Sequence, residues 1–491
     1  MRYAVSPDFL GELLLIIICL SYGLSWLIMF YIVSSKIHDS YKISWLVVTG
    51  GIPILGPLLF LLFANKKFTK KERRMERAIR AVLDTLPPKA EVIDKVGREN
   101  EEALLMSNYI YRETGSPLVD DSYVKYFPFG EIAFPYMLKE LKKAKHYIFL
   151  EYFIIEKGIM WNAILDILKA KAKEGLDVRV LYDDVGSVST LPSKYYRELR
   201  KFGIRAYAVN PLNLRMSIRL NNRDHRKIMV IDGHTGFTGG INLADEYINK
   251  KERFGVWKDN AIMIKGEAVY GLTRLFLATW LSIEKPNRPT IFDYYLPSVH
   301  IDECDDFDKK GYVQCYGDIP FNYEAVGENI YLHLIERAKK YVFISTPYLI
   351  IDAQMMSALV SAAKQGIDVR ILMPGIPDKK LVYTLAHAYY QPLLKGGVKI
   401  YEYTPGFVHM KMFVVDDIYA TCGTVNLDFR SLFLHSENGT FLYKTPCIMD
   451  MKQDFIDSFN LSRKISYDEY RNPKLRKRIT WGILKMFAPL L

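Results

Sequence analysis

Cysteine is scarce in this chain. Its 491 residues include five cysteines, an odd number, scattered without a Cys-x-x-Cys pair. Neither a disulfide framework nor a thiolate metal site is indicated, and we expect the main part of the chain to lie in a reducing compartment. A His-Glu-x-x-His motif and other Cys/His ligand spacings are also lacking, which disfavours a zinc hydrolase.

Charge alone does not identify the partner. Lysine and arginine number 66 against 55 acidic residues, a net charge of +11. Nucleic acid, an anionic membrane surface and an acidic substrate all suit such a balance. Because single cores stop growing at roughly 250–300 residues, two or three domains are expected.

Charged residues are absent from two long apolar runs near the N-terminus, Leu13 to Val33 and Ile43 to Ala64. Each has the roughly 20 residues that a helix needs to cross a bilayer. The first run is too long for a signal peptide and has no small-x-small cleavage site. We therefore predict a transmembrane hairpin in residues 1–65, with helices at about 11–33 and 43–64.

A basic segment follows this hairpin. Lys66 to Arg80 contains eight basic residues and two glutamates. By the positive-inside rule we expect a multi-pass protein of the cell membrane whose downstream part is cytoplasmic. Residues 66–105 are the expected juxtamembrane linker, and their cations would also hold the next domain near anionic headgroups.

An internal repeat organises the remainder. Residues 144–150 match 338–344, 172–181 match 363–372, and 225–243 align without a gap with 409–427. Since the order is the same, one domain has been duplicated. In each copy β-branched and aromatic runs alternate with amphipathic stretches, which predicts an α/β domain with helices covering a mixed sheet. The expected domains are 106–290 and 291–470, followed by a basic amphipathic tail, 471–491.

Each copy contains the pattern His-x-Lys-x-x-x-x-Asp, with an asparagine 17 residues beyond the histidine. Chance would produce the pattern only roughly 0.05 times per chain, so two at equivalent places in a repeat are a strong signal. The residues are His225, Lys227, Asp232 and Asn242 in the first copy, and His409, Lys411, Asp416 and Asn426 in the second.

The spacing has a chemical meaning. Residues i and i+2 of a strand share a face, so His225 and Lys227 point the same way. A histidine can be a nucleophile or a general acid, and a lysine beside it supplies positive charge for phosphate oxygens. Two facing half-sites would provide one nucleophile, one proton donor and two phosphate-binding lysines. Isolated histidines are more often structural, which is our expectation for His234 and His435 near the motifs.

A nucleophilic histidine also needs an acceptor that fixes its tautomer. Asp259 and Glu437 each open an apolar run, 34 and 28 residues past the histidine of their own copy, and each is followed by asparagine. The two acids could orient the imidazoles, or they could be loop acids at the starts of strands.

These motifs resemble the twin HxKxxxxD motifs of the phospholipase D superfamily. Other stretches resemble bacterial cardiolipin synthases, and together the similarities cover essentially the whole chain. They include Glu151 to Phe153, Leu181 to Asp183, Gly239 to Asn242, Asp245 to Tyr247, Thr346 to Tyr348 and Asn426 to Ser431. In this chain His435 and Ser436 precede Glu437, where other residues are usual in the family.

The resemblance implies a fold and a reaction. The fold is two tandem phospholipase D-like α/β domains, related by a pseudo-twofold axis, after the membrane hairpin. The reaction converts two phosphatidylglycerols to cardiolipin and glycerol through a phosphatidyl-histidine, without metal or cofactor. His225 is cast as nucleophile and His409 as acid/base, although symmetry permits the reverse. Phosphate oxygens would be held by Lys227, Lys411, Asn242 and Asn426, and the imidazoles oriented by Asp259 and Glu437.

Other functions share the motif. A membrane-bound phospholipase D or a phosphatidylserine synthase-like transferase would form the same intermediate and differ in its acceptor. The membrane anchor argues against a nuclease, so no nucleic-acid partner is expected, and phosphatidylglycerol and anionic lipids are. Intact histidines and lysines in both copies argue against a non-catalytic scaffold. The tail from Lys474 suits an interfacial amphipathic helix or a helix packed on the protein's own surface.

Overall fold

The computed structural model describes residues 7–35, 38–52, 54–63, 86–211, 222–284, 292–301, 309–320 and 324–490. They fall into two compact units. The smaller unit contains the N-terminal helices and the C-terminal segment from Lys474 onward. The larger unit contains the described residues from 86 to 473.

The smaller unit begins with α1 (Pro7–Ser34), α2 (Asp39–Gly51) and α3 (Leu55–Phe63). Within the described ranges α1 is the one helix long and apolar enough to cross a membrane, over Gly11–Ser34. The expected second spanning helix over 43–64 is not shown: in the described residues of this run α2 has 13 residues and α3 nine, against roughly 20 for a bilayer. Helix α2 ends at Gly51 and α3 begins at Leu55, and the sequence between them contains a proline, a residue type that has no backbone N–H and disfavours helix in the residue before it.

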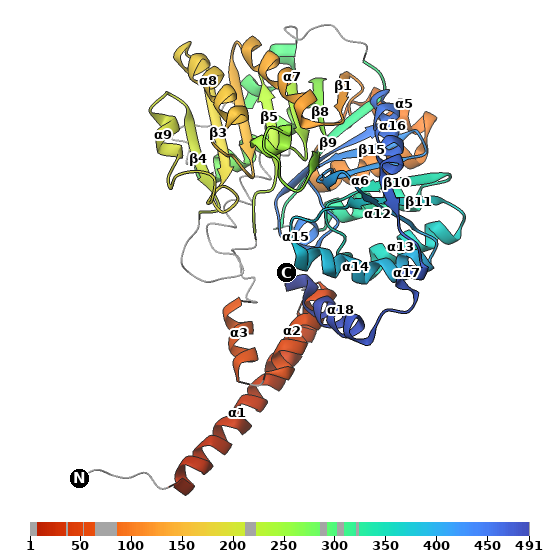
Figure 1. Cartoon of the computed structure of the whole chain (residues 1–491). Coiled ribbons are helices and arrows are strands. Elements are labelled where there is room, and N and C mark those ends of the chain that lie inside the picture. Colours follow the sequence, from red (N-terminus) through yellow and green to blue (C-terminus); the bar gives the residue numbers. More distant parts are fainter. Residues whose placement is uncertain are drawn as a thin grey trace, which may run out of the picture. The chain divides into compact units, whose positions relative to one another are not determined.

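A small core joins these helices to the C-terminal helix α18 (Leu475–Phe487). Ile32 of α1, Trp45 of α2 and Phe60 of α3 are buried in it, with Phe487 packed against them. Gly56 permits the close approach of α3 to α2, because a Cβ there would lie 2.3 Å from the carbonyl oxygen of Val48. The C-terminal segment is therefore a structural part of the unit that holds the apolar helix (Figure 1).

The first sheet of the larger unit has seven strands in the order β1-β8-β6-β5-β2-β3-β4. Strands β2, β3 and β4 are parallel, and the remaining pairs are antiparallel. The strands are β1 (Ser122–Phe127), β2 (Tyr147–Tyr152), β3 (Asp177–Asp183), β4 (Arg205–Val209), β5 (Lys227–Ile231), β6 (Thr235–Gly239) and β8 (Ala261–Gly266).

The second sheet repeats this order, with one additional strand, as β17-β12-β11-β10-β14-β15-β16-β9. Its strands are β9 (Tyr312–Asp318), β10 (Tyr341–Ser345), β11 (Asp368–Pro374), β12 (Lys399–Tyr403), β14 (Met412–Val415), β15 (Tyr419–Gly423), β16 (Glu437–Tyr443) and β17 (Ser462–Lys464). The predicted duplication of a mixed α/β fold is thus confirmed, strand by strand.

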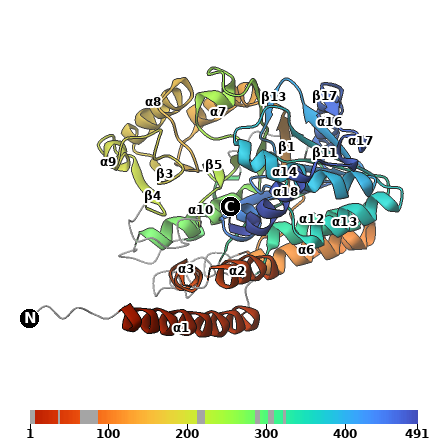
Figure 2. The ribbon, with the colours of Figure 1, turned by 60° about the horizontal axis from the view of Figure 1, so that its bottom comes forward.

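Helices cover both sheets (Figures 1 and 2). On the first sheet they are α7 (Gly130–Lys143), α8 (Ile159–Lys173), α9 (Tyr196–Arg200) and α10 (Val269–Ile283); on the second, α12 (Val326–Glu336), α13 (Ala353–Lys364), α14 (Lys380–Lys395) and α16 (Cys447–Asn460). The helices α10 and α16 each contact strands of both sheets. In the core that the sheets share, Phe276 of α10 stacks on Phe149 of β2 with ring centroids 4.5 Å apart.

The segment that precedes the first sheet packs on the second. It forms α5 (Ala90–Glu99) and α6 (Glu101–Thr114), and Asn100 caps α6 by accepting from the N–H of Ala103 at 3.2 Å. Tyr109 of α6 donates to Glu324 at 2.9 Å, and Gln314 of β9 donates to the carbonyl oxygen of Ser107 at 3.1 Å. The two repeats are therefore parts of one unit, and the domain boundaries proposed from sequence remain predictions.

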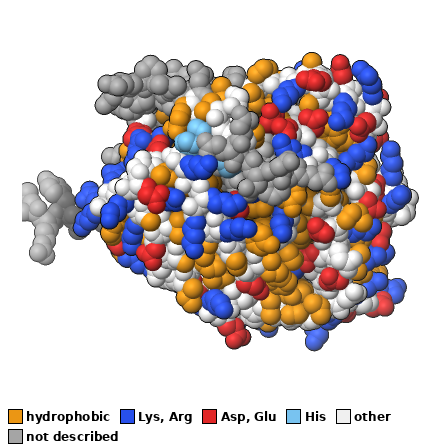
Figure 3. Space-filling view, turned by 90° about the horizontal axis from the view of Figure 1, so that it is seen from above, with side chains coloured by type: hydrophobic (Ala, Val, Ile, Leu, Met, Phe, Trp, Pro, Cys, Tyr) orange, Lys and Arg blue, Asp and Glu red, His pale blue; other side chains and the backbone are white. Residues whose placement is uncertain are grey.

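The surface charge is mixed. On the face seen in Figure 3, lysine and arginine side chains are spread among acidic and hydrophobic ones. The net charge of +11 is therefore not gathered into one stripe on that face.

Candidate active site

The backbone of His225 is tied to the second repeat. Its N–H donates to the carbonyl oxygen of Ser436 at 2.9 Å, and the N–H of Ser436 donates to the carbonyl oxygen of Arg223 at 2.8 Å. His225 lies two residues before β5, a central strand of the first sheet. One end of this strand is thus attached to the start of β16 in the other sheet.

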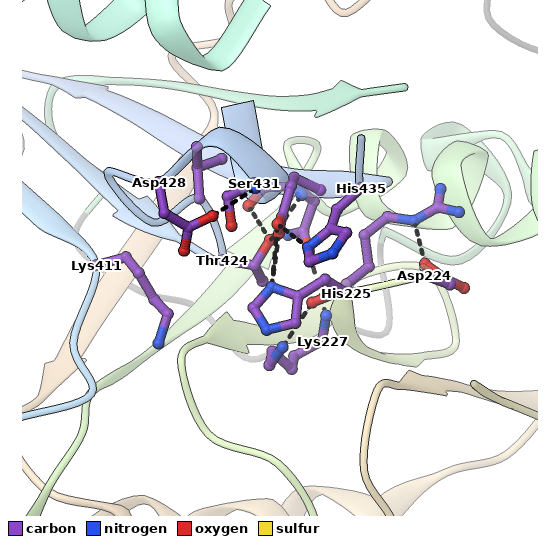
Figure 4. A network of polar contacts seen from close by, with 12 residues as sticks. Asp224, His225, Lys227, Lys411, Thr424, Asp428, Ser431 and His435 are labelled. Atoms are coloured by element: carbon purple, nitrogen blue, oxygen red, sulfur yellow. Dashed lines mark hydrogen bonds and ion pairs between the residues drawn. The ribbon is translucent and has the colours of Figure 1, made fainter. Parts of the chain in front are cut away.

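The same attachment brings an acid to the imidazole. Nδ1 of His225 donates to the carboxylate of Glu437, 2.9 Å from Oε2 and 3.1 Å from Oε1. Thr424 donates its hydroxyl to the same carboxylate, and Nδ1 of His435 lies 3.4 Å from Oε1 (Figure 4). Glu437 therefore fixes the tautomer of His225 and leaves Nε2 as the nitrogen that can react.

The second half-site is built in the same way with the repeats exchanged. Strand β13 (Gly406–Val408) pairs in parallel with β7 (Val256–Lys258), and the N–H of His409 donates to the carbonyl oxygen of Lys258 at 2.7 Å. Nδ1 of His409 then donates to Oδ2 of Asp259 at 2.7 Å. Each histidine is held by the acid of the other repeat, whereas counting along the sequence had associated each acid with the histidine of its own copy.

Both lysines of the motif are buried beside their histidines. Nζ of Lys227 donates to the carbonyl oxygen of His225 at 2.6 Å, and Lys411 donates in the same way to His409. The two lysines come from different repeats (Figure 4). Their ammonium groups influence each other electrostatically, as do the side chains of Lys227 and His409. The half-sites therefore converge on one region.

Burial dominates the electrostatics of this region. Desolvation lowers the pKa of Lys227 to about 7 and that of Lys411 to about 8. It also lowers the pKa of His409 to about 4 and that of His225 well below its usual value. Burial opposes the charge of Glu437, but the charges of and hydrogen bonds from His225 and His435 outweigh it and hold the pKa of that carboxyl well below its usual range. Neutral imidazoles bonded to an ionised carboxylate are the state in which histidine is nucleophilic.

The two asparagines beyond the motifs differ in their contacts. Asn242 accepts from the N–H of Ile154 at 3.0 Å and donates to the hydroxyl of Tyr247 at 2.7 Å, and the Tyr247 ring lies edge-on to His409. Asn242 thus supports the wall beside His409. The buried Oδ1 of Asn426 has no hydrogen-bond partner among the described residues.

The motif aspartates Asp232 and Asp416, which the motif predicts to belong to the catalytic set, bind backbone N–H groups at the start of a neighbouring strand, and their catalytic role stays a prediction. Asp232 accepts from the N–H groups of Lys145, His146 and Tyr147, each at 2.8 Å. Asp416 accepts from the corresponding residues 339–341 at 2.6–2.9 Å. Asp232 follows the far end of β5, whose five residues span about 16 Å. Both aspartates fix the start of the neighbouring strand and touch neither imidazole.

Sequence reasoning missed two contributors. Asn438 accepts from the N–H of Lys227 at 3.2 Å and donates to Thr238 at 2.7 Å, which fixes the motif strand. His435, expected to be merely structural, reaches Glu437. The repeated pairs Asp259-Asn260 and Glu437-Asn438 could have indicated the first, because the asparagine recurs after each acid. The second becomes visible only when the repeats are brought together.

The cluster of His225, His435 and Glu437 fits a hydrogen-bond network better than a metal site. His225, His435 and Glu437 offer ligand atoms within 4.8 Å of one another, as a metal site would. Glu437, however, already accepts from His225 and Thr424, and the neighbouring Lys227 would repel a cation when protonated. We interpret the cluster as a network that holds the imidazole.

Comparison with known proteins identifies the family. Residues 137–280 and 331–459 match the family described as cardiolipin synthase, PLD-like domain. The chain belongs to this family. It is 35% identical to a cardiolipin synthase of Alkalihalophilus pseudofirmus over 462 residues, covering 92% of this chain and 90% of the relative. An uncharacterised protein of Streptococcus mutans serotype c is 42% identical over 463 residues, covering 94% and 99%.

The solved phosphatidylserine synthase of Haemophilus influenzae Rd KW20 has the same fold, with a TM-score of 0.56 at 18% identity over 75% of this chain and 93% of that one. As a member of the cardiolipin synthase family, the chain is an enzyme that transfers phosphatidyl groups and acts on phospholipids. Helix α1, which among the described residues is long and apolar enough to cross a membrane, is consistent with a membrane anchor.

Replacing Asp232 with alanine should lower the stability of the protein and leave the catalytic rate of the folded molecules unchanged. The change leaves three backbone N–H groups without their charged acceptor, which should cost at least about 2 kcal/mol of unfolding free energy. Thermal unfolding in detergent should show a lowered midpoint, while the rate per folded molecule is retained. Asp416→Ala is the matched control in the other repeat. Unchanged stability together with lost activity would instead show that Asp232 has a catalytic role.

The protein should take up protons when it binds a phosphodiester at about pH 8, because burial lowers the pKa of Lys227 to about 7 and that of Lys411 to about 8. A bound anion favours the charged ammonium form and raises both values, so neutral lysines become protonated. Calorimetry in two buffers of different ionisation enthalpy measures the uptake. It should fall in Lys227→Met and in Lys411→Met, and equal heats in both buffers would contradict the burial of these cations.

Proposed function

We propose that this enzyme is a cardiolipin synthase that uses two phosphatidylglycerols and releases glycerol. The observation that carries the proposal is the pair of converging half-sites, in which His225 is bonded to Glu437 and His409 to Asp259. Family membership supports the choice of phospholipid substrate. Anionic phosphatidylglycerol also suits a site with two buried lysines.

The first half of the reaction forms a phosphatidyl-enzyme. Binding of the anionic phosphodiester raises the pKa of His409 and favours its protonated form. Nε2 of His225 then attacks phosphorus, the bond from phosphorus to the glycerol oxygen breaks, and protonated His409 gives its proton to that oxygen. Glycerol leaves, and phosphorus remains bonded to His225. Glu437 stabilises the positive charge on the imidazole, while Lys227 and Lys411 contact the phosphate oxygens.

In the second half of the reaction the proton moves in the opposite direction, and the bond between phosphorus and His225 breaks. His409, now neutral, accepts the proton from a terminal hydroxyl of a second phosphatidylglycerol. The hydroxyl oxygen attacks phosphorus, the bond to His225 breaks, and cardiolipin is released. In this scheme Asn242 orients the wall beside His409 through Tyr247, and Asn426 presents its carboxamide to the substrate.

We further propose that the enzyme is anchored in the cell membrane and that its larger unit lies in the cytoplasm. Support comes from α1, which can cross a bilayer, and from the excess of lysine and arginine in the sequence Lys66 to Arg80 that follows the apolar helices. A cytoplasmic site would meet phosphatidylglycerol of the inner leaflet.

The reaction can be tested on purified protein with phosphatidylglycerol as the only lipid. Wild type should produce cardiolipin and glycerol in equal amounts, and His225→Ala and His409→Ala should each lose about 10³-fold or more in rate. His333→Ala, outside the site, is the control. Phosphatidic acid as product would make the enzyme a phospholipase D, and turnover only with another alcohol, such as serine, would make it a different phosphatidyltransferase.

The roles of the histidines can be separated with a donor that needs no acid. A phosphatidyl ester of p-nitrophenol releases a stable phenolate, so attack requires the nucleophile but not the proton donor. His409→Ala should therefore still release a burst of nitrophenolate, whereas His225→Ala should release none. Rapid-mixing absorbance measures both. A burst in His225→Ala alone would exchange the two roles.

A further inference from the structure

Helix α18 exposes an apolar stripe. Leu475, Ile479, Ile483 and Met486 are 70, 54, 51 and 38% exposed. Their spacing of four, four and three residues places them on one face over about three turns of helix. Aligned large apolar side chains of this kind mark an interaction surface when they are rimmed by polar residues.

The stripe is not the face by which α18 packs within its own unit. Trp481 is the side chain that is buried, and beyond it Phe487 packs against the small core of α1, α2 and α3. Ser44 of α2 donates to the carbonyl oxygen of Met486 at 2.7 Å. At about 100° per residue, Trp481 lies well over a quarter turn from the centre of the stripe.

Cations border the stripe on both sides. On the same helical projection Arg476 falls next to Ile483, and Arg478 and Lys485 fall beyond Leu475 on the other side. The helix contains no acidic residue. An apolar arc flanked by basic side chains is the pattern of helices that lie in a membrane interface, with cations reaching anionic headgroups.

The depth of α18 relative to the membrane is set by its contact with the anchor. The core that Phe487 joins includes Ile28 and Ile32, which lie in the last two turns of the span Gly11–Ser34. One end of a membrane-crossing helix lies at the level of the headgroups. The packing therefore holds α18 at that level.

We propose that α18 is a membrane-surface helix whose stripe enters the anionic leaflet at the C-terminal end of α1. Its apolar side chains reach the boundary between headgroups and acyl chains, and Arg476, Arg478 and Lys485 bind the phosphates of anionic phospholipids. This surface is separate from the site of phosphatidyl transfer and does not rest on the proposed reaction.

The test uses the full-length protein in nanodiscs made of equal parts of phosphatidylglycerol and phosphatidylcholine. In a Cys19→Ser, Cys304→Ser background a fluorophore is attached to Ile483→Cys, since the other three cysteines are buried. The matched control carries the label at Thr480→Cys, an exposed residue of the same helix outside the stripe. Quenching is measured with nitroxides on lipid acyl chains and with iodide in water.

The label at residue 483 should be quenched severalfold more by acyl-chain nitroxides than the label at 480, and severalfold less by iodide. In nanodiscs of phosphatidylcholine alone, or with Arg476→Glu and Arg478→Glu, the lipid quenching should fall. Equal iodide quenching at both positions would overturn the proposal. So would protection from both quenchers, because that result would mean that protein covers the stripe. Phosphatidyl transfer by each labelled variant reports that it is folded.

Discussion

The two buried bonds between carboxylate and imidazole, each made across the repeats, are the constraint on which the active site depends. Glu437 and Asp259 are fully buried, so loss of its imidazole removes from each carboxylate a hydrogen-bond donor that water cannot easily replace. Leaving a buried hydrogen-bonding group without its partner typically costs about 1–3 kcal/mol, and more for a charged group. Neither repeat can therefore build a working half-site alone, because the first lacks the acid for its histidine and so does the second.

The backbone enforces the same exchange. His225 is bonded to Ser436 and His409 to Lys258, so the backbone just before each motif lysine is attached to the other repeat. These pairings, with α10 and α16 between the sheets, exclude water from the lysines and histidines. A desolvated ammonium interacts with a phosphate far more strongly than one in water. The fold thus holds two lysines where burial disfavours their charge and a bound anion restores it.

Much of the fold and of the candidate site could be predicted from the sequence. The main feature that could not be predicted depends on contacts between the two copies, on which sequence periodicity carries no information. Matching of residues 225–243 with 409–427 predicted two equivalent domains, because a duplicated strand order leaves a duplicated pattern. Pairing of the acids with the opposite histidines could not be predicted, since spacing along the chain carries no information on contacts between copies. The structural contacts of Asp232 could not be predicted either, because its place in the motif suggested chemistry, while its side chain accepts from three backbone N–H groups. The second apolar run was judged by hydropathy alone, whereas the described residues form two shorter helices, α2 and α3.

The two repeats have similar backbones, but the side chains around their two acids differ. Gly240 leaves room for Asp259, whose Oδ1 would lie 2.0 Å from an added Cβ, whereas the equivalent Thr424 donates a hydroxyl to Glu437.

Two residues before each acid the difference recurs. There Trp257 lies against His409 with ring centroids 5.6 Å apart, while His435 brings a second imidazole to Glu437. Glu437 is thus approached by two further side chains, Thr424 and His435, whereas Asp259 accepts its further hydrogen bond from the backbone N–H of Asn260 at 2.9 Å. A histidine that attacks phosphorus becomes cationic, whereas one that shuttles a proton must be able to return to neutrality. The half-site with the better supported anion therefore suits the nucleophile, and this asymmetry favours His225 over His409 for that role.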